Sequence, residues 1–244
     1  MHGVRYPVVE LRQYTLRPGQ REVLIDLFDR EFVDSQEAAG MAIVGQFRDL
    51  DEPDRFVWIR GFPSMPARAQ ALASFYGGPA WKAHSAQANA TMIDTDNVLL
   101  LRPVTVQSGF PAPAAPRHPV GHTPPEPSRV LVTLYYRDHP FDSVFADFFD
   151  RHARPVLVEA GATPLACLQT EHAENTFPAL PVRTGENLFV WLARFSSPAH
   201  LSSHLRQLEG STRWRDHVLP GLSAMTTAGP QQLQLAPTTR SLLR

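Results

Sequence analysis

Hydrophobic and polar residues alternate along several short segments of the chain, and each such segment predicts a β-strand. The segment V-V-E-L-R-Q-Y at residues 8–14 repeats every two residues, as the side chains of a strand do. The Pro18-Gly19 pair that follows it is typical of a turn. Beyond that turn, apolar residues recur at helical spacing: Leu24, Leu27, Phe28 and Phe32. The pattern predicts a strand followed by an amphipathic helix.

The next segments extend this pattern to a complete module. Alternating residues at 41–48 and 55–62, separated by the turn-rich L-D-E-P-D, predict a β-hairpin. A second helix is predicted from about Pro66, with an interruption at residues 77–79. The segment V-L-L-L-R-P at residues 98–103 predicts a last strand that ends at proline. This β-α-β-β-α-β order is that of a ferredoxin-like module, an antiparallel sheet with both helices on one face.

The same order recurs in the second half of the chain. F-V-W-I-R-G-F at residues 56–62 is matched by F-V-W-L-A-R-F at residues 189–195, an offset of 133. Upstream of these strands the offset is 121, and it pairs Val9 with Val130, Tyr14 with Tyr135, Phe28 with Phe149, Asp29 with Asp150 and Gly40 with Gly161. The difference between the offsets predicts an insertion, which falls within residues 171–186 and has the composition of an extended hairpin loop.

We therefore expect two tandem modules, at residues 1–105 and 129–244, joined by a proline-rich linker at residues 106–128. Helices cover each predicted sheet on one face only, so large apolar side chains on the other face need a partner. We expect the two sheets to pack against each other as a pseudo-dimeric α+β barrel, equivalent to a homodimer fused into one chain.

Spaced motifs in the first module resemble those of a known family. They are V-V-E-L-R-Q-Y-T-L-R-P-G, G-M-A-I-V-G, R-F-V-W-I-R-G-F, Arg68, F-Y-x-x-P-A-W and V-L-L-L-R-P. Together they span about residues 8–103 and resemble the NIPSNAP family of the dimeric α+β barrel superfamily. The second module keeps the tryptophans but lacks the P-G turn and the F-Y-x-x-P pattern. The resemblance implies the barrel fold, whereas the superfamily ranges from cofactor-free oxygenases, cyclases, isomerases and haem enzymes to non-catalytic proteins.

The alternation along the strands selects candidate functional residues. If Val9 and Leu11 lie under the helices, Glu10, Arg12 and Tyr14 point toward the other module. The same rule, extended to the hairpin and to the second module, gives the further candidates Arg48, Phe56, Trp58, Arg60, Phe62, Tyr135 and Trp191. Leu131, Thr133 and Ala193 occupy the positions of Glu10, Arg12 and Arg60 in the second module. Ionic groups from one module would thus face apolar groups from the other, which predicts a small-molecule cavity between them.

The candidates fall into two groups by chemistry. Catalytic candidates are Glu10, Arg12, Tyr14, Arg48, Arg60 and His84, and ligand-binding candidates are Phe56, Trp58, Phe62, Trp81, Tyr135 and Trp191. One carboxylate cannot neutralise three buried guanidinium groups, so an acidic, phenolic or enolate-like ligand group would be favoured. Alternatively, the arginines lie at strand ends and pair with loop carboxylates in solvent. Core packing, or a cap hydrogen bond for His84 and its counterpart His217, is the simpler explanation of the tryptophans and histidines.

Two functional hypotheses follow. The first is a cofactor-independent enzyme of the oxygenase, cyclase or isomerase type, using acid–base chemistry on an apolar aromatic or polyketide-like small molecule in the barrel cavity. The second is a non-catalytic small-molecule-binding or protein-interaction protein that presents the linker and the 171–186 loop to a partner. No metal site is expected, because His200 and His204 have no third ligand at motif spacing.

Composition and charge limit the partners and the cellular location that we expect for this protein. The net charge of -1 and the pI near 6.8 disfavour nucleic acid as a partner. Cys167 is the single cysteine, so an internal disulfide is excluded. Neither a signal peptide nor a membrane span is predicted, and we expect a cytoplasmic protein that binds a small molecule and could form a homo-oligomer.

Overall fold

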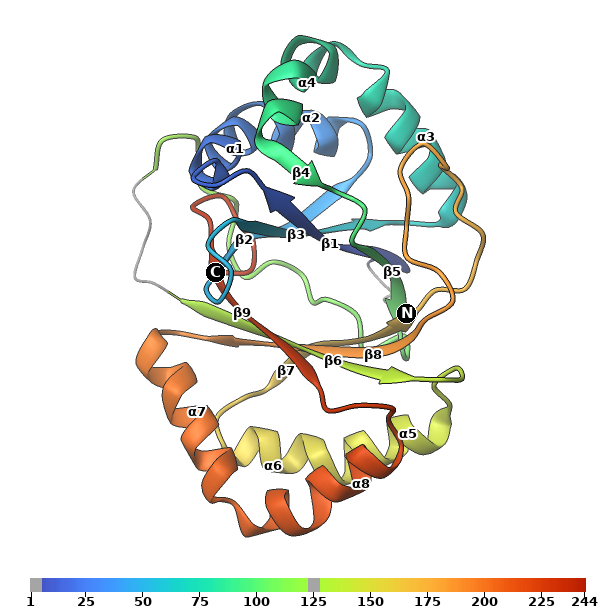
Figure 1. Ribbon diagram of the computed structural model, residues 1–244, viewed down its shortest axis with the longest axis vertical. Coiled ribbons are helices and arrows are strands. Elements are labelled where there is room, and N and C mark those ends of the chain that lie inside the picture. Colours follow the sequence, from blue (N-terminus) through green and yellow to red (C-terminus); the bar gives the residue numbers. More distant parts are fainter. Residues whose placement is uncertain (1–5, 123–127) are drawn as a thin grey trace.

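The computed structural model describes residues 6–122 and 128–244, and two outer layers of helices enclose a central β-structure (Figure 1). The first half comprises β1 (Val8–Leu16), α1 (Arg21–Leu27), η1 (Phe28–Phe32), α2 (Val33–Ala38), β2 (Ala42–Asp49), β3 (Arg55–Phe62), α3 (Met65–Tyr76), α4 (Pro79–Thr91), β4 (Met92–Asp94) and β5 (Val98–Pro103). The second half comprises β6 (Arg129–Arg137), α5 (Ser143–Phe148), η2 (Phe149–Ala153), α6 (Arg154–Glu159), β7 (Pro164–Thr170), β8 (Asn187–Phe195), α7 (Pro198–Gly210), η3 (Trp214–Val218), α8 (Leu219–Ala224) and β9 (Gln231–Pro237).

This order confirms the ferredoxin-like pattern in both halves, to which the short strand β4 is an addition. The helix break at residues 77–79 separates α3 from α4, as the Gly-Gly-Pro sequence predicted. Residues 123–127 of the predicted linker lie outside the described residues. Across the described ranges, none of the helices combines the length and the apolar character needed to cross a membrane.

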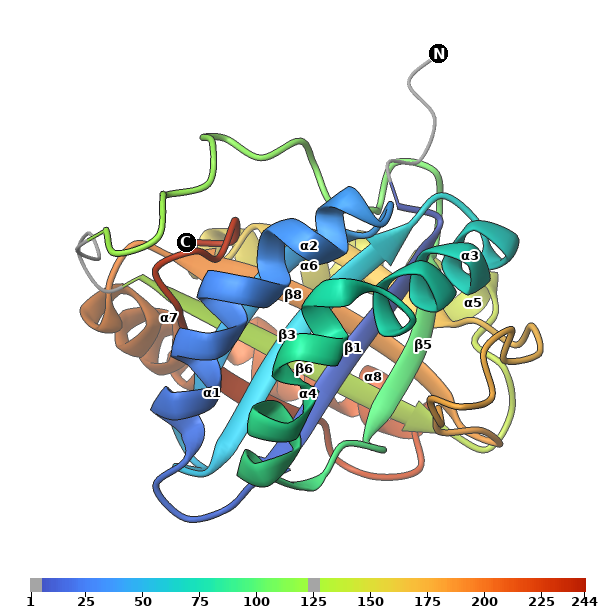
Figure 2. The ribbon, with the colours of Figure 1, turned by 90° about the horizontal axis from the view of Figure 1, so that it is seen from above.

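The eight long strands close into one antiparallel barrel. Their order is β2-β3-β1-β5 in the first half and β7-β8-β6-β9 in the second. The two sheets join edge to edge, because β2 pairs with β9 and β5 pairs with β7. Helices α1 to α4 cover one wall of the barrel and α5 to α8 the opposite wall, and Figure 2 looks through the first helical layer onto the strands. The predicted α+β barrel is therefore confirmed.

Aliphatic side chains fill the barrel interior. Val9 and Leu11 of β1 pack there with residues from both halves, including Val57, Ile59, Leu99, Leu101, Val130, Val132, Leu134, Leu168, Val190, Leu192, Leu233 and Leu235. Phe110, from the segment that connects the halves, reaches the same core. The predicted facing of the strands was therefore wrong: Tyr14, Phe56 and Trp58 pack against the helices of the first half. Aliphatic side chains thus fill the space between the two sheets in which the sequence analysis placed a cavity.

The helical layer of the first half is fixed by local signals. The Ser64 side chain accepts a hydrogen bond from the backbone N–H of Ala67 at 3.2 Å and caps α3. Gly40 follows α2 with a φ of 97°, a conformation that favours glycine. The π-helical turn η1 lies between α1 and α2 and carries Phe28 and Phe32 toward the sheet. Such turns are frequent at functional sites.

The predicted insertion is a loop between β7 and β8 that extends from the second half onto the first (Figure 1). Two backbone hydrogen bonds hold it along β5, from Glu171 N to Leu100 O and from Arg183 N to Val98 O, each at 2.9 Å. Near its tip, the Thr176 hydroxyl donates to the backbone oxygen of Met65 at 3.1 Å. This segment, residues 171–186, is the 171–186 loop.

Candidate functional site

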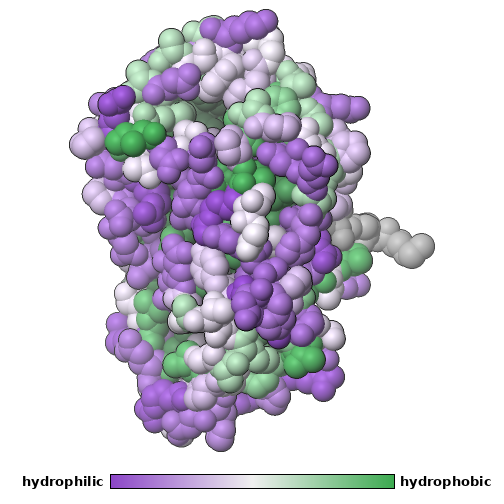
Figure 3. All heavy atoms as spheres, turned by 45° about the vertical axis from the view of Figure 1, so that its right-hand side comes forward, coloured by the Kyte–Doolittle hydropathy of each residue, from purple (hydrophilic) through white to green (hydrophobic). Residues whose placement is uncertain are grey.

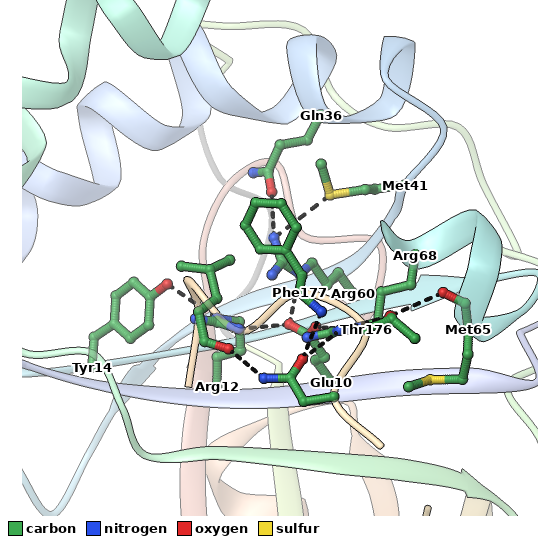
Figure 4. A network of polar contacts seen from close by, with 12 residues as sticks. Glu10, Arg12, Tyr14, Gln36, Met41, Arg60, Met65, Arg68, Thr176 and Phe177 are labelled. Carbon is green, nitrogen blue, oxygen red and sulfur yellow. Dashed lines mark hydrogen bonds and ion pairs between the residues drawn. The ribbon is translucent and has the colours of Figure 1, made fainter. Parts of the chain in front are cut away.

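Four ionic side chains meet between the sheet and the helices of the first half (Figure 4). Glu10 on β1 lies directly opposite Arg60 on β3, and Arg12 follows on the same face of β1. Glu10 Oε2 accepts from Arg12 Nη1 at 2.6 Å and from Arg60 Nε at 2.7 Å. Glu10 Oε1 accepts from Arg68 Nε, on α3, at 2.6 Å. None of the four residues is more than 1% exposed, so together they form a buried ionic cluster.

The ionic cluster carries an excess of positive charge, since three guanidinium groups surround one carboxylate. Burial alone would raise the pKa of Glu10, but the charges of Arg60, Arg12 and Arg68 outweigh it and hold the pKa far below its usual value. Burial also disfavours the Arg12 cation, yet Tyr14 and Glu10 more than compensate and its pKa is raised. Unneutralised buried charge is costly, so an anionic ligand group would stabilise this arrangement.

Two guanidinium nitrogens of the ionic cluster have no hydrogen-bond acceptor among the described residues. They are Arg60 Nη2 and Arg68 Nη2, and both are buried. The neighbouring nitrogen of Arg60, Nη1, donates to Gln36 Oε1 at 3.2 Å and lies 3.6 Å from Met41 Sδ. A buried donor without an acceptor costs about 1–3 kcal/mol. A ligand that brought acceptor oxygens to Arg60 and Arg68 would remove this cost.

An aromatic pocket adjoins the ionic cluster, with a volume of about 110 Å³. It is lined by Tyr14, Leu24, Phe28, Phe32, Gln36, Trp58, Phe75, Tyr76, Trp81, Asn89, Met92, Thr95 and Leu180. Tyr14 and Gln36 belong to the pocket and also hydrogen-bond the arginines of the cluster. Figure 3 shows a hollow in the surface at the first-half end of the molecule. An enclosed apolar cavity of about 150 Å³ holds benzene; this pocket is smaller but partly open, so its scale is that of a single small ring.

Tyr14 supplies a hydroxyl group where the pocket meets the ionic cluster. Arg12 Nε donates to Tyr14 Oη at 3.0 Å, and within the described part of the chain the hydroxyl proton has no acceptor. Burial raises the pKa of Tyr14, although Arg12 acts in the opposite direction, so the phenol stays protonated at neutral pH. The indole N–H of Trp58 is also buried without an acceptor among these residues. The site therefore offers two uncharged donors beside its cations.

The equivalent place in the second half has no ionic cluster. The β6–β8 register sets Leu131 opposite Ala193, just as the β1–β3 register sets Glu10 opposite Arg60. Tyr135 and Trp191, predicted to bind ligand, are buried there in a core completed by the second-half helices. Burial raises the pKa of Tyr135 to about 12. Neither residue lines the first-half pocket, so their predicted role at a shared cavity was wrong.

Two predicted catalytic residues, Arg48 and His84, belong neither to the pocket lining nor to the ionic cluster. Arg48 donates to both carboxylate oxygens of Glu22 at 2.8 and 2.6 Å in a surface ion pair, which is the alternative that the sequence left open. His84 is partly exposed, with Nε2 at 3.4 Å from Glu31 Oε2, and its ring packs against Phe32. The structure gives neither residue a contact with the ionic cluster.

The predicted aromatic residues of the first half divide between the pocket and the core behind it. Trp58 and Trp81 line the pocket. Phe56 packs in the core against Phe28, with ring centroids 5.3 Å apart. Phe62 lies under Arg60, whose guanidinium carbon is 5.5 Å from the ring centroid. Phe56 and Phe62 therefore support the site without lining it.

Several site residues were not among the predicted ones. Arg68 shares helical spacing with the buried residues Ala71, Leu72 and Phe75 on α3, and that periodicity could have placed it on the buried face. Gln36 occupies a similar position on α2. By contrast, Leu180 comes from the 171–186 loop, and no periodicity in the sequence connects that loop with the first half.

Comparisons with known proteins agree with this architecture. A protein of Fusobacterium nucleatum named a putative monooxygenase is 10% identical, with a TM-score of 0.57 and coverage of 97% of this chain and 94% of that one. One of the same name from Lactobacillus acidophilus is 11% identical, with a TM-score of 0.55 and coverage of 96% and 94%. An anthrone oxidase-like protein is 12% identical, with a TM-score of 0.54 and coverage of 97% and 94%.

At these identities the three solved structures show a shared fold. A search of curated proteins found no match. The NIPSNAP family model matches residues 9–107, which span β1 to β5 and include Glu10, Arg12, Arg60 and Arg68. The first half of this chain, which holds the ionic cluster, is therefore the part that matches the NIPSNAP family.

Proposed function

We propose that the first half of the barrel carries the active site of a cofactor-independent enzyme that acts by acid–base chemistry on a small, mainly apolar aromatic molecule. The observation that carries this proposal is the buried ionic cluster with its excess positive charge, in contact through Tyr14 and Gln36 with an aromatic pocket. The site lies under the first-half helices, and the second half completes the barrel below it.

Glu10 organises the cluster and is unsuited to accept a proton. A carboxylate whose pKa lies far below its usual value is a weak base, and both Glu10 oxygens already accept hydrogen bonds from guanidinium groups. Its role is to hold Arg12, Arg60 and Arg68 at fixed positions. The guanidinium groups in turn stabilise negative charge that develops on an enolate or phenolate oxygen of the substrate, because preorganised cations act strongly in a site that excludes water.

Tyr14 is the residue that moves a proton. Its raised pKa keeps the hydroxyl protonated, and that proton is free for a ligand in the pocket. Donation to a substrate anion leaves a phenolate on Tyr14, which the Arg12 Nε–H at 3.0 Å stabilises. The reverse step returns the proton to Tyr14. Proton transfer at an enolisable or phenolic group is thus the elementary step that this site supports best.

The named neighbours fit this class of substrate. An anthrone oxidase-like protein and two putative monooxygenases share the fold, and an anthrone is an aromatic compound with an acidic C–H bond. Loss of that proton gives a resonance-stabilised anion, which the cations of the ionic cluster would stabilise. Anthrone has three fused rings, however, whereas the pocket of about 110 Å³ has room for about one. A single-ring substrate fits this protein better.

Exchange of acidic protons tests the proposal without knowledge of the natural substrate. Single-ring phenols and aryl ketones are incubated with the protein in D₂O, and deuterium uptake at enolisable and ring positions is followed by NMR. We expect wild-type protein to accelerate exchange for at least one compound, and Tyr14→Phe and Arg60→Ala to lower the rate about 10²–10⁴-fold. Arg48→Ala is the matched control, because that arginine pairs with Glu22 at the surface. Wild-type exchange rates in Tyr14→Phe would refute the assigned role.

Binding without catalysis is the second candidate, and one observation favours it. The pKa of Glu10, the carboxylate of the ionic cluster, is too low for a general base at neutral pH. A binding protein would need only the cations and the pocket. Saturable binding of a panel compound, with no deuterium uptake above the rate in buffer, would support this candidate over the enzyme.

A further inference from the structure

We infer that the 171–186 loop of the second half determines which ligand the first-half site accepts, and that it selects a small ring compound bearing a carboxylate. The inference builds on the proposed site but does not depend on catalysis. Two features of the loop carry it: the way in which it holds Arg68, and the wall that it adds to the pocket.

The loop positions Arg68 without neutralising it. Arg68 Nη1 donates to Asn175 Oδ1 at 2.9 Å and to Thr176 Oγ1 at 3.3 Å. Both acceptors are uncharged, so the second half fixes the orientation of this guanidinium and leaves its positive charge intact. The remaining nitrogen, Nη2, has no acceptor among the described residues, and the same holds for Nη2 of Arg60. Neither arginine lines the pocket, so the ligand's carboxylate would enter the cluster past Tyr14 and Gln36, the pocket residues that hydrogen-bond Arg12 and Arg60. There its two oxygens can satisfy these nitrogens and reduce the excess charge of the cluster.

Asn175 joins the two features. Its Oδ1 accepts from Arg68 and also from the backbone N–H of Phe177, at 3.0 Å. Its Nδ2 donates to the backbone oxygen of Leu180 at 2.9 Å. One side chain therefore sets the position of a cation in the site and the conformation of the turn that presents Phe177 and Leu180. Asn175 is a positioning residue on this account.

Leu180 and Phe177 limit the size of the ligand. Leu180 is part of the pocket wall. Phe177 stacks on Tyr76, another wall residue, with ring centroids 6.1 Å apart and an angle of 25° between the planes. Leu180 thus bounds a pocket of about 110 Å³, and Phe177 packs against a residue of its wall. A ligand with two fused rings would have to displace this part of the loop.

The two halves differ in the length of the connection between their second and third long strands. The connection between β2 and β3 covers residues 50–54, whereas the connection between β7 and β8 covers residues 171–186. The second half, which lacks the ionic cluster, is thus the half that bears the long loop. Its loop contributes to the site that the first half retains.

Binding of simple ring compounds tests the inference. Benzoate, benzamide and 2-naphthoate are titrated into the full-length protein, and quenching of tryptophan fluorescence is measured, because Trp58 and Trp81 line the pocket. For wild-type protein we expect benzoate to bind at least 10-fold more tightly than benzamide, its uncharged analogue, and more tightly than 2-naphthoate. Circular dichroism and thermal melting establish that each variant is folded.

Two variants separate the charge effect from the size effect. Asn175→Asp keeps the acceptor for Arg68 and adds a negative charge to it, but it also loses the Nδ2 donor to the backbone oxygen of Leu180. Benzoate affinity should therefore fall at least 10-fold, and at least 10-fold more than benzamide affinity. Leu180→Ala enlarges the pocket, and the ratio of 2-naphthoate to benzoate affinity should rise about 10-fold or more. His172→Ala is the control, since this exposed residue of the same loop does not line the pocket.

Each outcome decides a separate point. Equal binding of benzoate and benzamide by wild-type protein, or binding of neither, would overturn the assignment of a carboxylate ligand. Wild-type affinities in both loop variants would overturn the role of the 171–186 loop. The expected binding pattern together with no deuterium exchange would uphold this inference and reject the enzyme, so the two proposals fail independently.

Discussion

Replacement of Glu10 by Gln tests the electrostatic logic of the site most directly. Glu10 is fully buried, and its two oxygens accept hydrogen bonds from three guanidinium groups at 2.6 to 2.7 Å. The amide is nearly isosteric with the carboxylate, so packing changes little. Its NH₂ group, however, points a donor at other donors, and the three arginines lose their shared counterion.

The expected cost follows from the loss of a buried partner. Breaking a buried ion pair by removing one member costs about 3–5 kcal/mol, because the remaining charge is left uncompensated. For a chain of this size each kcal/mol lowers the melting temperature by roughly 2–4 °C. Glu10→Gln should therefore melt about 6–20 °C below wild type. An anion that enters the cluster would restore part of the loss, so benzoate should raise the melting temperature of the variant more than that of wild type.

Calorimetry of one further variant makes this reasoning refutable. The second half shows which residues fill the same positions without charge, namely Leu131, Thr133, Ala193 and Leu201. The quadruple variant Glu10→Leu, Arg12→Thr, Arg60→Ala and Arg68→Leu removes every charge of the cluster together. Because no ion is left unpaired, it should be more stable than Glu10→Gln despite four substitutions. A quadruple variant that is less stable than Glu10→Gln would show that uncompensated charge is not the main cause of the instability of Glu10→Gln.

The remaining predictions concern pH and the barrel core. Because the folded-state pKa of Glu10 is depressed, its contribution to stability is present above its unfolded pKa of about 4.3 and is lost as the pH falls, so denaturation below pH 4 should be less steep in Glu10→Gln. Burial raises the pKa of Asp29 to about 6, so the free energy of unfolding falls as the pH rises from about 4 to 6. The change in unfolding free energy that Asp29→Asn causes, measured by urea titration, should therefore be up to about 3 kcal/mol more stabilising at pH 7.5 than at pH 4. Ile59→Ala, in the barrel interior, should cost about 2–5 kcal/mol and leave benzoate affinity unchanged.

The sequence by itself determined the elements and the grouping of the site residues. Period-two alternation put Glu10, Arg12 and Tyr14 on one face of β1, and the recurrence of the same order in the second half indicated the barrel. These features are local, since the two faces of a strand are fixed by the backbone itself. The loss of the charges in the second half was likewise readable from Leu131 and Ala193.

Only the tertiary structure decided which face of each strand meets the helices. Both faces of β1 are buried, one against helices and one in the barrel, so Val9 and Glu10 are equally shielded from water. Period-two alternation therefore separates the residues of the two faces, but it does not show which face meets the helices and which lines the barrel interior. The sequence analysis accordingly placed the cavity on the barrel side of the sheet, whereas the ionic cluster and the pocket lie on the helix side.

Contacts between distant segments also lay beyond the sequence pattern. Arg68 meets Asn175 across more than a hundred residues, and Arg48 pairs with Glu22 instead of joining the ionic cluster. Such contacts depend on how the two halves join through β2–β9 and β5–β7 and on where the 171–186 loop then lies. Periodicity reports the side of an element on which a residue lies, whereas the partner of a charged side chain is set by the three-dimensional packing of elements that are remote along the chain.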